Sequence, residues 1–173
     1  MTSTRIATTL MTLALAALLG AGCGKDEDKR IRTARDLAKT FHDAVLRSDV
    51  RVMLECVDYP FCLDDRNRIA ASEDVLKPLL EKQRLAMYDR VQSANVTEVL
   101  TYEEFVGGKS FSGQPLAKEA AAAEAKKVGL RDGGLIVRCY HEDRETKRQD
   151  GRCYYLVMHQ NSLGELKVTT YWD

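Results

Sequence analysis

The chain has 173 residues, and its 26 lysines and arginines balance its 26 aspartates and glutamates, so the formal net charge is zero at pH 7. This balance removes the electrostatic reason to expect nucleic acid or an anionic lipid surface as a partner. Once an export segment is set aside, the length allows one hydrophobic core and is too short for two.

The N-terminal segment is apolar and ends in a cysteine. Arg5 is the only charged residue before Lys25, and residues 6–19 are apolar apart from threonines. This length is typical of a signal-peptide core and is shorter than the about 20 apolar residues of a membrane-spanning helix. The sequence Leu-Gly-Ala-Gly-Cys ending at Cys23 resembles the cleavage site of bacterial lipoproteins, in which the segment is removed and the cysteine is acylated.

We therefore expect a lipoprotein signal peptide over residues 1–22 and lipid attachment at Cys23, with the acyl chains as the contact with the membrane. The expected location is the bacterial cell envelope. Because Gly24 rather than aspartate follows the cysteine, the resemblance implies the outer membrane. The alternative is an ordinary cleaved signal in which Cys23 forms a disulfide. Residues 23–31 are rich in charge and are predicted to be a tether, followed by a single α+β domain over residues 32–173.

Helical periodicity dominates the start of this domain. An apolar stripe from Arg32 to Val45 predicts a first helix, and Ser48-Asp49 is typical of the N-cap of a short second one. Tyr59-Pro60 indicates an extended exit, because proline disfavours the α conformation of the residue before it. A third helix is predicted from Ser72 towards Tyr88, with Pro78 either kinking it or beginning its regular part.

A strand is predicted over residues 96–105, followed by a loop over 107–113 and an alanine-rich helix over 116–128 that ends at Gly129. A meander of three strands is then predicted over residues 135–142, 152–160 and 165–172. A symmetric first hairpin centres near Thr146, which places Cys139 opposite Cys153.

The four cysteines after Cys23 are even in number, which in an exported domain indicates disulfides, and sequence alone allows three pairings. The predicted register favours Cys139–Cys153, leaving Cys56–Cys62. Some of these cysteines are alternatively small buried residues. No C-x-x-C spacing is present, so neither a redox pair nor a zinc ribbon is indicated.

Three segments resemble the nuclear transport factor 2-like superfamily, also called cystatin-like α+β. They are Phe41 to Val45 leading into Ser48-Asp49, then Asp58 to Phe61, and the terminal strand from Leu166 to Asp173. The resemblance implies an α+β fold in which N-terminal helices pack on a curved antiparallel sheet of about four strands, with a cone-shaped pocket between them. The family includes isomerase-like and cyclase-like enzymes and many binding domains without catalysis, so the fold alone implies no reaction.

The candidate chemical groups share no motif. His42, His141 and His159 are far apart in sequence, so no metal site is predicted. His42 adjoins Phe41 on the helix that would line the pocket. The remaining candidates for an acid, base or donor are Asp43, Asp58, Asp64, Asp65, Tyr59 and Tyr102. No spacing selects among them, so no catalytic residue and no cofactor is assigned.

These observations favour a non-catalytic binding or assembly module on a lipid anchor. Its partner would be a small apolar ligand or an envelope protein, and its oligomeric state is open. Tyr154, Tyr155, Tyr171 and Trp172 either pack in the core or line a ligand pocket. One alternative is a small pocket enzyme, isomerase-like or cyclase-like, with an aspartate or histidine base. Another is a structural envelope component with a filled core.

Overall fold

The computed structural model describes residues 29–63, 68–82, 91–111, 113–143 and 149–172. The chain divides into two units, Met1–Thr33 and Ala34–Asp173, and the strands all lie in the second. Cys23, the predicted signal peptide and most of the predicted tether are outside the described residues. Within the described part, no helix is long and apolar enough to cross a membrane.

The first helix spans residues 29–47, so it includes the last three residues of the predicted tether. Its buried side is the stripe Ala34, Ala38, Phe41 and Ala44, with helical spacing as predicted. The helix α2 (Val50–Cys56) follows at once. The Asp49 carboxylate accepts a hydrogen bond from the Val52 N–H at 3.2 Å, which confirms the N-cap.

The described strands form one six-stranded sheet in the order β2-β1-β6-β5-β4-β3. They are β1 (Val57–Leu63), β2 (Arg68–Ala70), β3 (Val91–Thr101), β4 (Leu135–Asp143), β5 (Gln149–Gln160) and β6 (Leu166–Trp172). The prediction of about four antiparallel strands is wrong, because β1 and β2 extend the sheet and β1 runs parallel to β6. The exit at Tyr59-Pro60 is extended as predicted, and that conformation allows this segment to pair as a strand.

Three further helices complete the described fold: α3 (Glu73–Lys82), α4 (Tyr102–Val106) and α5 (Lys118–Lys127). The predicted strand over 96–105 therefore ends too late. Thr101 and Glu104 form a reciprocal capping box that starts α4. The predicted end of α5 is confirmed, since Gly129 has a φ of 75° and Leu130 N–H bonds back to the Ala125 carbonyl at 2.8 Å.

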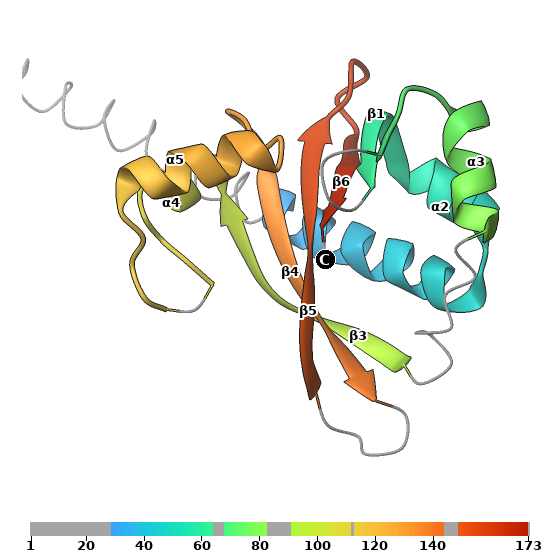
Figure 1. The fold of residues 1–173 in the computed structure, drawn as a ribbon, viewed down its shortest axis with the longest axis horizontal. Helices are drawn as coiled ribbons and strands as arrows, with labels where there is room; N and C mark the ends of the chain where they lie inside the picture. Colours follow the sequence, from blue (N-terminus) through green and yellow to red (C-terminus); the bar gives the residue numbers. More distant parts are fainter. Residues whose placement is uncertain (1–28, 64–67, 83–90, 112, 144–148, 173) are drawn as a thin grey trace, which may run out of the picture. The chain divides into compact units, whose positions relative to one another are not determined.

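The sheet has two covered faces. The inner face carries Val137, Cys139, Tyr154 and Leu156, and packs against the first helix through Tyr154 and His42. The outer face carries Ile136, Arg138, Tyr155 and Val157. On it, α4 and α5 build a second core, made of Leu100, Phe105, Ala125, Val128, Leu130, Ile136 and Val157. Each large aliphatic side chain buried in this way contributes about 1.5–3 kcal/mol. Figure 1 shows α4 and α5 on the opposite side of the sheet from α2 and α3.

The predicted register of the β4–β5 hairpin is wrong by one residue. Cys139 pairs with Tyr154, and Cys153 pairs with Tyr140. Because neighbouring residues of a strand point to opposite faces, this shift places Cys139 on the inner face and Cys153 on the outer face, and removes the reason for pairing them. Cys56 is the last residue of α2 and Cys62 is the last but one residue of β1, and the two are not bonded to each other. All four of these cysteines are free thiols in the structure.

Candidate functional site

His42 and Tyr154 meet between the first helix and the inner face of the sheet. The Nδ1 atom of His42 lies 2.5 Å from the Tyr154 hydroxyl, and the two rings stack with centroids 5.6 Å apart. Only 2% of His42 and 1% of Tyr154 is exposed. A buried imidazole needs such a partner, because an unsatisfied polar atom costs about 1–3 kcal/mol. The contact therefore joins the first helix to β5.

The same group extends along the inner face. Tyr154 stacks on Tyr171 of β6 with ring centroids 5.2 Å apart, and Cys139 lies across from Tyr154 on β4. Burial raises the pKa of the Cys139 thiol to about 12, although a hydrogen bond with Tyr154 opposes the shift. Cys139 is therefore an unreactive packing residue at neutral pH.

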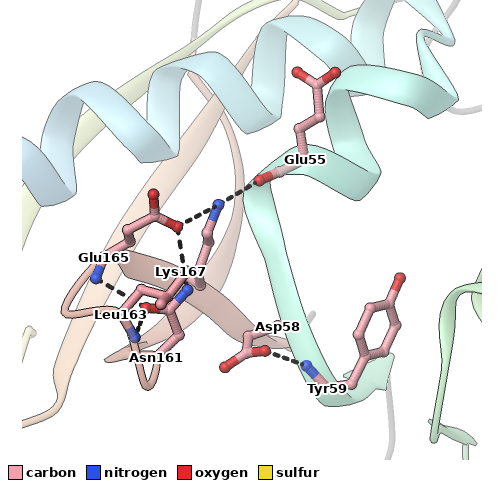
Figure 2. A network of polar contacts seen from close by, with 7 residues as sticks. All are labelled: Glu55, Asp58, Tyr59, Asn161, Leu163, Glu165 and Lys167. Carbon is pink, nitrogen blue, oxygen red and sulfur yellow. Dashed lines mark hydrogen bonds and ion pairs between the residues drawn. The ribbon is translucent and has the colours of Figure 1, made fainter.

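Of the predicted carboxylate candidates, Asp43 and Asp58 are described, and neither has a hydrogen bond or ion pair with this group. Asp43 and Asp58 are half-buried, and Asp58 accepts a hydrogen bond from the Tyr59 N–H at 2.9 Å. Figure 2 shows the Asp58 carboxylate bound to the backbone while the Tyr59 ring points away from it. Asp64 and Asp65 lie outside the described residues, as does the side chain of His141. Tyr102 belongs to the other side of the sheet, where it packs against the core beneath α4 and α5.

The β5–β6 hairpin is attached to α2 through Lys167. The Lys167 ammonium donates a hydrogen bond to the Glu55 carbonyl at 2.8 Å and forms an ion pair with Glu165 at 3.5 Å (Figure 2). The side-chain oxygen of Asn161 accepts the N–H groups of Leu163 and Glu165, which fixes the turn. A cation at the carboxyl end of a helix also interacts favourably with the helix dipole. The network is therefore a structural attachment.

His159 is likewise held by the fold. Its Nε2 atom lies 3.1 Å from the Gly129 carbonyl, and its ring lies against Gly134. Burial lowers the pKa of His159. The hydrogen bond with the Gly129 carbonyl acts to raise this pKa, and the positive charge of Arg131 acts to lower it further. The neutral ring thereby joins β5 to Gly129, which follows the C-cap of α5, and lies against the residue that precedes β4.

A cleft of about 530 Å³ opens on the outer face at the end of β3. It is lined by Glu98 and by the loop between α4 and α5, including Lys109, Phe111 and Pro115. Neither Glu98 nor this loop was selected as a site from the sequence, since a single glutamate in a strand and a glycine-containing loop are common on protein surfaces.

Several contacts hold the loop that forms the cleft. Arg138 donates a hydrogen bond to the Phe111 carbonyl, and its guanidinium carbon lies 4.4 Å from the Tyr140 ring centroid. The Phe111 ring packs on Tyr155 with centroids 5.3 Å apart. At the base of the loop, Leu116 N–H donates to the Gly108 carbonyl at 2.9 Å. Gly108 has a φ of 97°, and a Cβ atom there would lie 2.6 Å from the Leu116 carbonyl, so this position requires glycine.

Some charged side chains around the cleft form ion pairs and others do not. Lys109 donates to Glu104 at 2.9 Å, and this bond raises the pKa of Lys109. Burial acts to raise the pKa of Glu104, but the hydrogen bonds from Lys109 and the Thr101 N–H outweigh it and the pKa is lowered. Across the described ranges, the Glu98 carboxylate has no hydrogen bond or ion pair; it interacts electrostatically with Lys109, and Arg138 is its register partner on β4.

No three His, Cys, Asp or Glu side chains of the described residues come together in a way that could hold a metal ion. His42 and His159 lie on different elements, each with its own partner.

Comparison with solved structures finds likeness to nuclear transport factor 2-like, ketosteroid isomerase-like and cystatin-like folds. A ketosteroid isomerase-like protein from Erwinia carotovora atroseptica is 12% identical, with a TM-score of 0.46 over 82% of this chain and 92% of that chain. A nuclear transport factor 2-like protein with a cystatin-like fold from Novosphingobium aromaticivorans is 12% identical, with a TM-score of 0.45 over 89% and 85%. A protein with a cystatin-like fold from Nostoc punctiforme is 13% identical, with a TM-score of 0.45 over 79% and 84%.

At these identities and TM-scores the likeness says nothing about what this chain binds or does. No family model matches the sequence. No curated protein matches it either.

Proposed function

We propose that this chain is a lipid-anchored protein of the bacterial cell envelope, held in the outer membrane through Cys23, and that its α+β domain is a non-catalytic binding or assembly module. The anchor is supported by the sequence alone: an apolar segment that ends in small residues and a cysteine, followed by Gly24.

The observation that carries the binding role is the contrast between the two faces of the sheet. On the inner face, the titratable side chain His42 is buried and bonded to Tyr154. On the outer face, a cleft is bounded by the loop between α4 and α5 and is lined by Glu98, whose carboxylate has no hydrogen bond or ion pair among the described residues and interacts with Lys109 only electrostatically. A group that acts as acid or base must reach its substrate. The accessible polar group here is instead placed for recognition.

Replacing Cys23 with serine tests the anchor. The wild-type chain should incorporate an alkyne-tagged fatty acid and sediment with membranes, because each buried methylene contributes about 0.8 kcal/mol to membrane binding. Cys23→Ser should lose both the label and the sedimentation. The matched control is Cys62→Ser, which changes a half-buried cysteine of β1 and should keep both. Membrane retention of Cys23→Ser at the wild-type level would contradict the anchor.

Photo-crosslinking in cells tests the binding role. A benzophenone amino acid at Pro115, an exposed residue that lines the cleft, should give an adduct of defined mass. The same group at Ala122, an exposed residue of α5, serves as the control and should give none. Equal yields from the two positions, or no adduct from Pro115, would contradict a binding surface at the cleft.

A further inference from the structure

The free edge of β3 lies beside the cleft and belongs to the same surface. In the sheet order, β3 is the last strand after β4, and the described residues give it no backbone hydrogen bond to any other segment along 91–100. An edge strand presents unpaired N–H and C=O groups to which an extended chain can bind.

The hydrogen bonds at the end of β3 show which main-chain groups are free. The Tyr102 N–H bonds to Gly134 next to β4, whereas the Thr101 N–H turns away from β4 and is bound by the Glu104 side chain. Since successive residues of a strand alternate in this direction, the N–H and C=O of Val99 also point to the free edge. The register shift between Val96 and Glu98 limits the regular edge to a short stretch.

Glu98 precedes Val99 in the strand, and its negative charge indicates that a partner should carry a positively charged side chain at this place. Residues opposite each other in paired strands share a face, with Cβ atoms about 4.5–5.5 Å apart. A residue of an added strand opposite Glu98 would therefore project onto the outer face, where the cleft opens. Phe111 lines the same cleft, and an aromatic ring also attracts a cation.

From this juxtaposition we propose that the edge of β3 and the cleft together bind a short extended peptide, whose main chain pairs with Val99 and whose arginine or lysine side chain enters the cleft and pairs with Glu98. The proposal deepens the proposed function, on which it rests, by naming the kind of partner segment.

The β3 strand of a second copy of this chain does not meet the requirements for the bound peptide. The sequence of that strand, VQSANVTEVLT, contains no lysine or arginine to offer to Glu98. Within the protein, Lys109 lines the same cleft and interacts electrostatically with Glu98, but its ammonium is bonded to Glu104 at 2.9 Å. The guanidinium of Arg138 is directed to the Phe111 carbonyl and the Tyr140 ring. Neither cation forms an ion pair with Glu98 among the described residues, so the carboxylate can accept a hydrogen-bonded cation from a partner.

Fluorescence anisotropy with the full chain in detergent micelles tests the pairing. The probe is a labelled peptide, Thr-Val-Thr-Arg-Thr-Val-Thr, compared with a peptide that has norleucine in place of arginine. The arginine peptide should bind wild type about tenfold more tightly, the lower range for a hydrogen bond between charged groups. Glu98→Gln should reduce this preference to about twofold or less. The control Glu119→Gln, an equal charge change on the exposed surface of α5, should leave the preference intact.

A third peptide, N-methylated on alternate residues on each side of the arginine, tests the strand pairing. It keeps the cation but cannot form the edge hydrogen bonds, so its affinity should fall about tenfold. Equal binding of the arginine and norleucine peptides, an arginine preference that survives Glu98→Gln, undiminished binding of the methylated peptide, or no binding of any peptide would each overturn the proposal. None of these results alters membrane retention through Cys23, so failure here is distinguishable from failure of the anchor.

Discussion

Gly134→Ala should destabilise the protein because His159 occupies the space that a side chain would need. A Cβ atom built on Gly134 lies 2.4 Å from Cε1 and 2.9 Å from Nδ1 of His159. Carbon atoms in contact are about 3.5–4.0 Å apart, so the ring must move by about 1 Å or more. That movement breaks its 3.1 Å contact with the Gly129 carbonyl. Overpacking costs about 1–3 kcal/mol and the lost hydrogen bond about 1 kcal/mol, so we expect a loss of about 2–4 kcal/mol.

A double-mutant cycle separates this explanation from simple backbone strain. In His159→Ala the ring is absent, so the additional cost of Gly134→Ala should fall by at least about 1 kcal/mol. Some cost should remain, because the new Cβ also lies 2.8 Å from the Arg131 carbonyl. Urea unfolding followed by the fluorescence of Trp172, the chain's single tryptophan, measures all four free energies. Additive effects, within about 0.5 kcal/mol, would refute the reasoning.

The pH dependence of the same site has a defined sign. Burial lowers the pKa of His159 in the folded protein, below the value of about 6.5 for an unfolded chain. The stability that the neutral ring contributes is therefore present above about pH 6.5 and is lost as the pH falls through the lower, folded pKa. Between about pH 7.5 and pH 5, wild type should lose more unfolding free energy than His159→Ala. An equal loss in the two proteins would contradict this prediction.

Three further predictions concern other contacts. Thr101→Ala removes the N-cap of α4 and should lower the free energy of unfolding by about 1 kcal/mol in urea titration, whereas no loss would contradict the capping role. Lys167→Met removes the bond to the Glu55 carbonyl and should cost about 0.5–1.5 kcal/mol, measured against Lys126→Met on the exposed face of α5; equal effects would argue against the attachment. Iodoacetamide at about pH 8 should leave Cys139 unmodified in the native protein, because its pKa is raised to about 12, and mass mapping that finds it alkylated without urea would contradict its burial.

The features predicted correctly are those set by local chemistry. Asp49 is followed by a helix because its short carboxylate can accept a backbone N–H, and Gly129 ends α5 because it adopts a positive φ easily. Both signals need only a few neighbouring residues. The same kind of signal was present at Thr101 and Glu104, where the pattern of a capping box starts α4, but the alternation of β3 concealed it.

The errors come from contacts between distant segments. The β4–β5 register was predicted by assuming a symmetric hairpin about Thr146, and the irregularity between Tyr140 and Glu142 shows that the hairpin is not symmetric. A shift of one residue moves a side chain to the other face, so Cys139 and Cys153 separate. Nor does any local pattern show that the loop containing Phe111 folds back over Arg138. The cleft follows from that contact, so it could not be read from the sequence.

The parallel pairing of β1 with β6 has a consequence for the order in which the sheet is assembled. Val57 pairs with Val168, about 110 residues later, and Leu63 pairs with Tyr171 close to the C-terminus. The entropy lost in closing so long a loop must be offset by contacts that form with it, and pairings of this kind are slow. During synthesis, the β1–β2 pair cannot join the other described strands until β6 is made. Truncation before Leu166 should therefore detach the whole β1–β2 edge and not the final strand alone.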